Sequence, residues 1–199
     1  METLSLVNRA MELGAVQIPE ELSAFVDFLK TRQLRNVMEI GSEAGGTFWL
    51  WCQLAAMGGL KISLDKPDGD SGSGRFASPD ELIARTAKFK TFAPRVRVIT
   101  GDSHRPPIRD AVEQALGGEK LDFLFIDGDH SFNGVKQDFL DYSTFVRPGG
   151  VIAFHDINDS EFHRKRGCFV ATFWRGALFG PKREFNTYRE WGGIGVVEL

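Results

Sequence analysis

Cysteine and net charge are both scarce in this sequence. Cys52 and Cys168 are the only cysteines among 199 residues, too few for a framework of disulfides. We expect both to be small core side chains in a reducing compartment. The 24 basic and 27 acidic residues leave a formal net charge of −3. No overall positive field therefore favours nucleic acid or an anionic membrane as a partner.

A long apolar run and a basic leader are absent as well. No segment approaches the ~18 apolar residues that cross a bilayer. The N-terminus has no basic region followed by an apolar one. We therefore expect a cytoplasmic protein without a membrane partner. With 42% hydrophobic and 26% charged residues the composition is globular, and residues 1–199 are predicted to form a single domain.

Short apolar segments alternate with helical patterns along the chain. Strands are predicted for residues 36–40, 60–64, 96–100, 121–126 and 151–154. Helices are predicted within 1–34 and over 47–57, 78–92 and 132–146, the third of them opened by a capping box of Ser78 and Glu81. This alternation predicts an α/β fold, a doubly wound Rossmann-like sheet with parallel strands and helices on both faces.

The C-terminal part departs from this alternation. Residues 182–187 and 193–199 are predicted to form an antiparallel pair at one edge, giving a mostly parallel sheet of about seven strands. Residues 158–180, with a helix over 169–178, are predicted to be an insertion on the substrate side. The run 163–166 is basic, and we expect it to be solvated. The segment 66–77 is rich in glycine and serine and would be either a lid or an ordinary loop.

Acidic residues follow every predicted parallel strand. In an open parallel sheet, ligands bind outside the carboxyl ends of the strands. Like charges gathered at one rim repel one another unless a cation or a polyhydroxyl ligand uses them. The sequence therefore predicts a ligand site along this rim, formed by Glu39, Asp65, Asp102, Asp127 and Asp156.

The turn 41–46 and the acid after the second strand narrow the choice of ligand. Glu43 stands where a dinucleotide fingerprint has its second glycine, and its carboxylate would repel a pyrophosphate. A ligand with a cationic end would meet no such repulsion. Asp65 is placed to accept both hydroxyls of an adenosine ribose, which suits NAD and S-adenosylmethionine equally. Asp102 is placed to meet the adenine edge.

Several short motifs at these strand ends carry a family resemblance. They are Glu39-Ile40-Gly41, Gly45-Gly46, Asp65, Gly101-Asp102-Ser103, Ile126-Asp127-Gly128-Asp129-His130 and Arg147-Pro148-Gly149-Gly150. With them the sequence resembles the class I S-adenosylmethionine-dependent methyltransferases. It is similar in particular to the subgroup of cephalosporin-hydroxylase-like and macrolide-sugar O-methyltransferases. The resemblance extends over residues 19–199.

The resemblance implies S-adenosylmethionine as the cofactor and assigns residues to each part of it. The cofactor-binding residues would be Glu39, Gly41, Ser42 and Gly45 around the methionine part, Asp65 at the ribose, Asp102 and Ser103 at the adenine, and Asp127 beside them.

The resemblance also implies a divalent metal, Mg²⁺ or Mn²⁺, and a general base. The positions that hold the metal in the subgroup match Asp127, His155 and Asp156. His155 departs from the acid or amide found there in relatives, and an imidazole favours manganese, iron or zinc over magnesium. His130 matches the base, and Asp127 is grouped with it as catalytic. A neutral imidazole can take the proton of an attacking hydroxyl. Neighbouring acids would raise the pKa of His130, but we expect the metal to neutralise them in part, so that the net shift is small.

The sequence thus predicts a metal-assisted O-methyltransferase that acts on a small hydroxylated acceptor, with a homo-oligomer left open. Three alternatives remain. One is a dinucleotide-binding oxidoreductase, which Glu43 disfavours. The others are a nucleoside-binding module without catalysis and a metal-dependent hydrolase built on the Asp and His residues. If these residues have only a structural role, His130 would cap a helix and His155 would form a hydrogen bond with the backbone.

Overall fold

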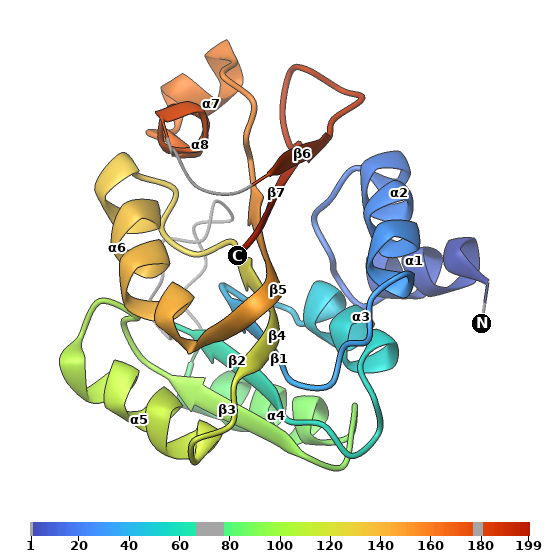
Figure 1. Ribbon diagram of the computed structural model, residues 1–199, viewed down its shortest axis with the longest axis vertical. Coiled ribbons are helices and arrows are strands. Elements are labelled where there is room, and N and C mark those ends of the chain that lie inside the picture. The colour runs from blue at the N-terminus through green and yellow to red at the C-terminus, as the bar shows by residue number, and fades with distance from the viewer. Residues whose placement is uncertain (1, 67–77, 177–180) are drawn as a thin grey trace.

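The computed structural model describes residues 2–66, 78–176 and 181–199. Helices pack on both faces of one central sheet (Figure 1), so the predicted doubly wound α/β fold is confirmed. The predicted loop 66–77 lies outside the described residues except for Lys66, as do residues 177–180 of the predicted insertion. In the described part of the chain, no helix is both long and apolar enough to cross a membrane.

Within the described residues, seven strands form the sheet in the order β3-β2-β1-β4-β5-β7-β6. Five of them are parallel: β1 (Val37–Ile40), β2 (Lys61–Asp65), β3 (Val96–Thr100), β4 (Leu121–Ile126) and β5 (Val146–His155). The predicted antiparallel edge pair is also confirmed, as β6 (Lys182–Phe185) and β7 (Ile194–Glu198). The strand order reverses between β1 and β4, and such a reversal opens a crevice at their carboxyl ends.

Two layers of helices bury the two faces of the sheet. One face is covered by α1 (Thr3–Glu12), α2 (Pro19–Lys30) and α3 (Gly46–Leu54), with α4 (Pro79–Lys90) beside α3. The other face is covered by α5 (Pro106–Leu116), α6 (Phe132–Tyr142) and α8 (Val170–Gly176). A short helix, α7 (Glu161–Lys165), and a 3-10 turn, Ser143–Phe145, complete the described elements.

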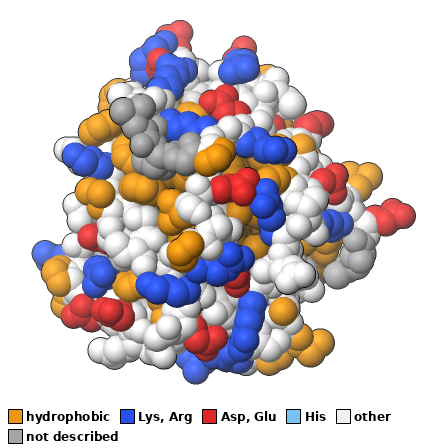
Figure 2. Space-filling view, in the orientation of Figure 1, with side chains coloured by type: hydrophobic (Ala, Val, Ile, Leu, Met, Phe, Trp, Pro, Cys, Tyr) orange, Lys and Arg blue, Asp and Glu red, His pale blue; other side chains and the backbone are white. Residues whose placement is uncertain are grey.

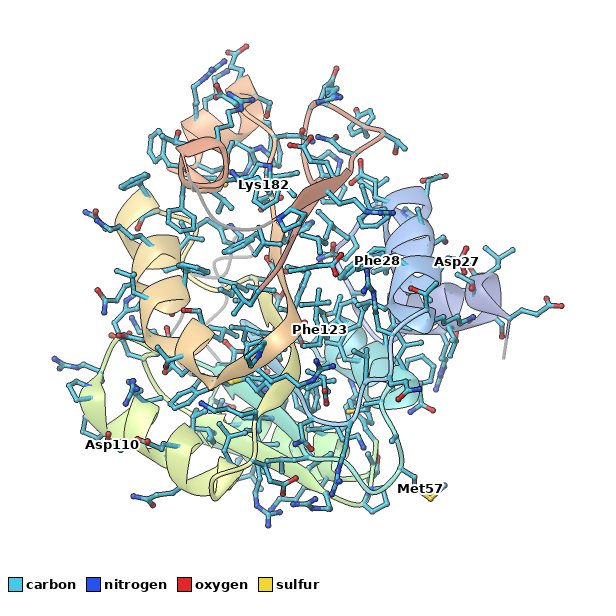
Figure 3. All side chains as sticks on the ribbon, in the orientation of Figure 1. Asp27, Phe28, Met57, Asp110, Phe123 and Lys182 are labelled. Atoms are coloured by element: carbon cyan, nitrogen blue, oxygen red, sulfur yellow. The ribbon has the colours of Figure 1, made fainter. Side chains whose placement is uncertain are left out.

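Aromatic side chains fill the layer between the sheet and α2 and α3. The Phe25 ring of α2 lies 5.6 Å from that of Trp51, edge to face, and Trp51 lies 5.2 Å from Phe123 of β4. Phe123 lies near the middle of the molecule in Figure 3, whereas Met57 projects from its lower edge. This packing fixes α3, and with it the turn that precedes α3, against the end of β1.

Three local features differ from the sequence prediction. The helix α5 was not predicted, because two adjacent prolines usually interrupt a helix, but here both lie in its first turn, where their missing N–H groups are not needed. Residues 148–150 form an irregular, bulged part of β5 instead of a turn before it, with the register shifting between Leu121 and Phe123 of β4. The predicted basic run lies mostly on α7, where His163 is buried instead of solvated.

Basic and acidic side chains are interspersed over the face shown in Figure 2. That distribution agrees with the small net charge of the sequence. Among the described residues, no surface of a single charge therefore marks a ligand site on this face.

Candidate functional site

The turn 41–46, called here the glycine turn, packs directly on the end of β4. Gly41 and Gly45 both have φ of +88°, a conformation that glycine adopts without strain. A Cβ on Gly41 would lie 2.0 Å from the carbonyl oxygen of Asp127, and a Cβ on Gly45 would meet the ring of Phe89. Ser42 in this turn is buried, and its hydroxyl accepts a hydrogen bond from Ser63 at 2.8 Å. The close contacts therefore require glycine at both positions of the turn.

Glu39 lies fully buried at the base of this turn. The indole N–H of Trp51 donates to its Oε1 at 3.1 Å, whereas Oε2 is buried and meets no hydrogen-bond partner among the described residues. Burial raises the pKa of Glu39 to about 8; hydrogen bonding to Thr47 and Trp51 opposes that shift, and the charge of Asp127 adds to it. One oxygen of this carboxyl group is thus available to a donor that a ligand would supply.

Asp65, at the end of β2, is tied to the glycine turn and to α4. Its Oδ2 accepts the N–H of Glu43 at 2.8 Å and the guanidinium of Arg85 at 2.9 Å. The Arg85 side chain is 16% exposed, so this ion pair is partly shielded from solvent. Burial raises the pKa of Asp65, and Arg85 opposes that shift. Sequence reasoning found Asp65 but not its partner Arg85.

Asp102 and Ser103 follow β3, as predicted, and lie beside a pair that was not predicted. Asp102 accepts the N–H of His104 at 3.1 Å, and the carbonyl of Ser103 accepts the Tyr142 hydroxyl at 2.8 Å. The Nε2 atom of His104 lies 3.3 Å from Oδ1 of the fully buried Asp138 on α6. That interaction with Asp138 raises the pKa of His104 to about 9. The sequence signal for this pair was Asp138, an acid that lies on the buried face of α6 among apolar residues.

The ends of β4 and β5 bring four predicted residues together as the Asp–His cluster: Asp127, His130, His155 and Asp156. Oδ1 of Asp127 lies 3.1 Å from Nε2 of His130 and 3.2 Å from Nδ1 of His155. Asp156 lies 3.3 Å from Nδ1 of His130 and 3.5 Å from Nδ1 of His155. The cluster is mostly buried, and His130 is its most exposed member, at 37%.

Two further side chains orient the carboxylates of this cluster, and sequence reasoning missed both. The amide of Gln17 donates to Oδ2 of Asp127 at 3.2 Å. Nε2 of the buried His163 lies 3.1 Å from Oδ1 of Asp156, and its Nδ1 lies 2.6 Å from the carbonyl of Asn158. Asp156 itself has φ of +60°, which non-glycine residues seldom adopt. The backbone and both neighbours thus aim these carboxylates into the cluster.

Mutual attraction dominates the electrostatics of the Asp–His cluster. Burial alone would raise the pKa of Asp127 and of Asp156, but the charges of His155 and His130 hold both pKa values below the usual range. Burial would lower the pKa of the two histidines, yet the carboxylates raise the pKa of His155 to about 9 and that of His130 well above its usual value. The expectation of a small pKa shift for His130 assumes a metal that partly neutralises these acids, and it stays a prediction.

The cluster holds donor atoms in a spacing that suits a metal ion. The ligating atoms of Asp127, His155 and Asp156 lie within 4.8 Å of one another, as do those of His130, Asp156 and Cys168. The first set combines two carboxylates with an imidazole, a donor set that divalent transition ions accept. The three predicted metal-ligating residues are therefore brought together, and they fit such an ion.

A loop from the C-terminal edge closes one side of this region. Glu21 of α2 is buried, and its carboxylate accepts the N–H groups of Thr187, Tyr188 and Gly193 at 2.6 to 2.9 Å. The Trp191 ring of the same loop lies 6.4 Å from that of His155, edge to face. The sequence showed Glu21 only as an acid in the first turn of a helix, so its role in holding this loop was missed.

Comparison with known proteins places the chain in a family. A family model described as a methyltransferase domain matches residues 38–157. Uncharacterized protein R132 of Acanthamoeba polyphaga mimivirus is 33% identical over 122 residues, 61% of this chain and 51% of that protein. Uncharacterized protein y4gI of Sinorhizobium fredii is 25% identical over 145 residues, 70% of this chain and 14% of that protein. The chain thus spans about half, or less, of the length of these relatives.

Solved structures show the same fold at low identity. An O-methyltransferase from Bacillus cereus in complex with S-adenosylhomocysteine has a TM-score of 0.64 at 23% identity, over 100% of this chain and 91% of that one. The MycE methyltransferase of the mycinamycin biosynthetic pathway, in complex with Mg, S-adenosylhomocysteine and mycinamycin VI, has a TM-score of 0.56 at 16% identity, over 100% and 54%. The family model matches more than half of the length of this chain, from β1 to just beyond β5. The chain therefore belongs to the methyltransferase-domain family.

Proposed function

We propose that the chain is an S-adenosylmethionine-dependent O-methyltransferase that acts on a small hydroxylated acceptor. The observation that carries the proposal is the adjacency of two groups of residues at the strand ends. Glu39, the glycine turn and Asp65 lie at the ends of β1 and β2 and would form the cofactor crevice. The Asp–His cluster begins at Asp127, whose carbonyl oxygen packs against Gly41. A cofactor in the crevice would thus present its reactive end to the cluster.

The residues present fit the proposed cofactor. The unpartnered Oε2 of Glu39 would accept a hydrogen bond from the ammonium group of the methionine part. Because the pKa of Glu39 is raised, its carboxyl group would have to release its proton before it could pair with that charge. Asp65 would accept the ribose hydroxyls, and Asp102 and Ser103 border the adenine side. When bound, the cofactor supplies an electrophilic methyl group to the acceptor hydroxyl. The B. cereus and MycE structures were both solved with S-adenosylhomocysteine, which supports the same cofactor here.

A divalent metal would be held by Asp127, His155 and Asp156. When bound, it would lower the pKa of a hydroxyl on the acceptor and orient that hydroxyl. The same carboxylates raise the pKa of His130, so their use as metal ligands would remove much of that shift. His130 would then take the acceptor proton on a ring nitrogen. MycE was solved in complex with Mg, which supports a divalent metal as part of the proposed reaction.

The proposal is tested first by calorimetry with S-adenosylhomocysteine and with NADH. We expect the first to bind and the second not to, and we expect Asp65→Ala to weaken S-adenosylhomocysteine by about tenfold or more, since charge-assisted hydrogen bonds are lost. Asp110→Ala is the matched control, because Asp110 is an exposed acid on α5 that lies at the edge of the molecule in Figure 3. Preferential NADH binding, or unchanged affinity in Asp65→Ala, would contradict the cofactor assignment.

Turnover is tested with methyl-labelled S-adenosylmethionine and a panel of sugars and phenols, with Mn²⁺, with Mg²⁺ and after EDTA treatment. We expect label in a hydroxyl-bearing acceptor and a rate that EDTA lowers. Binding without turnover on any acceptor would instead favour a nucleoside-binding module. Full activity after EDTA would remove the metal from the proposal and leave the acids as hydrogen-bonding groups.

A further inference from the structure

A second set of metal-ligating atoms lies beside the proposed metal triad, Asp127, His155 and Asp156. The ligating atoms of His130, Asp156 and Cys168 lie within 4.8 Å of one another, and Cys168 has no part in the proposed methyl transfer. The three residues come from different segments: the loop after β4, the end of β5 and the segment between α7 and α8. Their convergence therefore depends on tertiary structure and not on one local motif.

Backbone hydrogen bonds hold this second set in place. The N–H of Phe169 donates to the carbonyl of His130 at 2.7 Å, which ties the segment that carries Cys168 to the loop after β4. The N–H of Cys168 donates to the carbonyl of His163 at 3.0 Å, and His163 in turn contacts Asp156. Cys168 is 6% exposed, whereas the His130 side chain is 37% exposed. The set is thus held together by the backbone and meets solvent at His130.

The chemistry of these three donors selects a thiophilic ion. Thiolate, imidazole and carboxylate together are typical of zinc, whereas Mg²⁺ prefers oxygen ligands alone. Bond lengths of about 2.0 to 2.3 Å place the ligands of a tetrahedral zinc roughly 3.3 to 3.7 Å apart. Nδ1 of His130 and Oδ2 of Asp156 already lie 3.3 Å apart. Closing the set on an ion therefore requires side-chain rotation and no rearrangement of the sheet.

We propose that His130, Asp156 and Cys168 form a zinc site that shares Asp156 with the proposed metal triad of Asp127, His155 and Asp156 and that inhibits methyl transfer. Zn²⁺ would bind the three side chains with water as fourth ligand, and the thiol proton of Cys168 would pass to solvent. Asp156 belongs to both sets, and His130 is the proposed base. Zinc at the second set therefore removes one ligand from the catalytic metal and blocks proton removal. The inhibitory consequence rests on the proposed function, but zinc binding itself does not.

Cobalt substitution tests the site without any assay of activity. Co²⁺ bound to a thiolate gives a charge-transfer absorption in the near ultraviolet, which oxygen and nitrogen ligands do not give. We expect this band in the wild type, its displacement by one equivalent of Zn²⁺, and no displacement by excess Mg²⁺. Absence of the band, or its displacement by Mg²⁺, would overturn the proposal even if no variant could be purified.

Variants assign the band to a residue. Cys168→Ser and Cys168→Ala should lose it and should bind zinc at least ~10- to 100-fold more weakly, the range that even an indirect partner of a metal ligand contributes. Cys52→Ser is the matched control, because Cys52 is the other cysteine, is buried on α3 and belongs to neither metal set. A band that persists in both Cys168 variants, or disappears in Cys52→Ser, would place the thiolate elsewhere and reject the site.

Inhibition is measured separately, as the zinc concentration that halves methyl transfer relative to each protein's own zinc-free rate. We expect about tenfold more zinc to be needed for Cys168→Ser than for the wild type. Equal zinc sensitivity with an intact cobalt band would leave the site but reject the inhibition. Should no acceptor be turned over at all, the proposed function fails while the cobalt experiment still decides whether the zinc site exists.

Discussion

His130 lies between two carboxylates, and this position limits what the imidazole can do. Its two ring nitrogens contact Asp127 and Asp156, and both contacts stabilise the protonated ring. A protonated imidazole cannot act as a general base. The base role therefore requires that something else engage the carboxylates, which links proton removal to occupancy of the metal triad.

His130→Ala tests the proposed role of this side chain as the general base. A general base contributes typically ~10²–10⁴-fold in rate, so kcat should fall by about that factor. S-adenosylhomocysteine should bind normally by calorimetry, because no contact of His130 reaches the glycine turn or Asp65. The acid limb of the wild-type pH profile of kcat should disappear with the imidazole. Near-normal kcat on the true acceptor would mean that His130 is a packing residue.

Glu39 provides a prediction about pH and stability. Because burial raises its folded-state pKa from 4.5 to about 8, the folded protein retains a proton that the unfolded chain has lost between these values. The stabilising contribution is therefore complete below about pH 4.5 and is lost as the pH rises towards 8. Glu39→Gln has no ionisable group at this position. As the pH rises through this range, its free energy of unfolding should increase relative to that of the wild type by about 1 kcal/mol per pH unit.

Urea unfolding of both proteins at pH 5, 6.5 and 8 measures that difference. Comparing the variant with the wild type cancels the titration of all other groups, which shifts both curves together. A difference that stays constant across the three pH values would show that the Glu39 carboxyl group ionises normally in the folded protein.

At the scale of elements, α4 holds the glycine turn from outside the main core. Arg85 donates to the carbonyl of Glu43 at 3.2 Å as well as to Asp65, and the ammonium of Lys88 donates to the carbonyl of Ala44 at 2.9 Å. The Phe89 ring of the same helix covers Gly45. Contacts from successive turns of one helix therefore fix the backbone on which the cofactor would rest.

A charge-removing change on α4 tests this role. Arg85→Met keeps the apolar stem but frees both the glycine turn and Asp65, so affinity for S-adenosylhomocysteine should fall by roughly three- to tenfold, the equivalent of about 1 kcal/mol. Lys90→Met is the matched control, since Lys90 is an exposed cation in the last turn of the same helix. Tighter binding in Arg85→Met would show instead that Arg85 competes with the ribose for Asp65.

The elements that could be predicted from sequence are those whose signals are local. β4 is a short apolar run closed by Asp127, and the Ser78–Glu81 capping box marks the start of α4. Pairings between distant residues could not be predicted. Glu21 meets Thr187, 166 residues away, and nothing near either residue specifies the other. The candidate ligand acids were found because parallel strands end at one rim, whereas Arg85, Gln17 and Cys168 reach that rim from helices and loops.

At the scale of the whole molecule, the candidate site joins parts that are far apart in sequence. The proposed cofactor site would draw on the ends of parallel strands, on α4, whose Arg85 contacts Asp65, and on the loop that Glu21 holds. The N-terminal helices are part of the same structure, because Leu22 and Phe25 of α2 pack in one core with Trp51 of α3. A ligand at the strand ends would therefore contact segments from distant parts of one folded unit, and its binding should stabilise that unit as a whole.

The last prediction concerns the stability of the whole domain. A ligand that binds only the folded protein stabilises it by about 2.7 kcal/mol when present at 100 times its Kd. For a domain of this length, that free energy corresponds to a rise in Tm of roughly 5–10 °C. We expect this rise for the wild type and for Asp110→Ala with S-adenosylhomocysteine, and a rise about half as large, or smaller, for Asp65→Ala at the same concentration, because its affinity is at least about tenfold weaker. Differential scanning calorimetry provides the measurement. A rise in Asp65→Ala equal to that of the wild type would place the ligand outside the crevice at the strand ends.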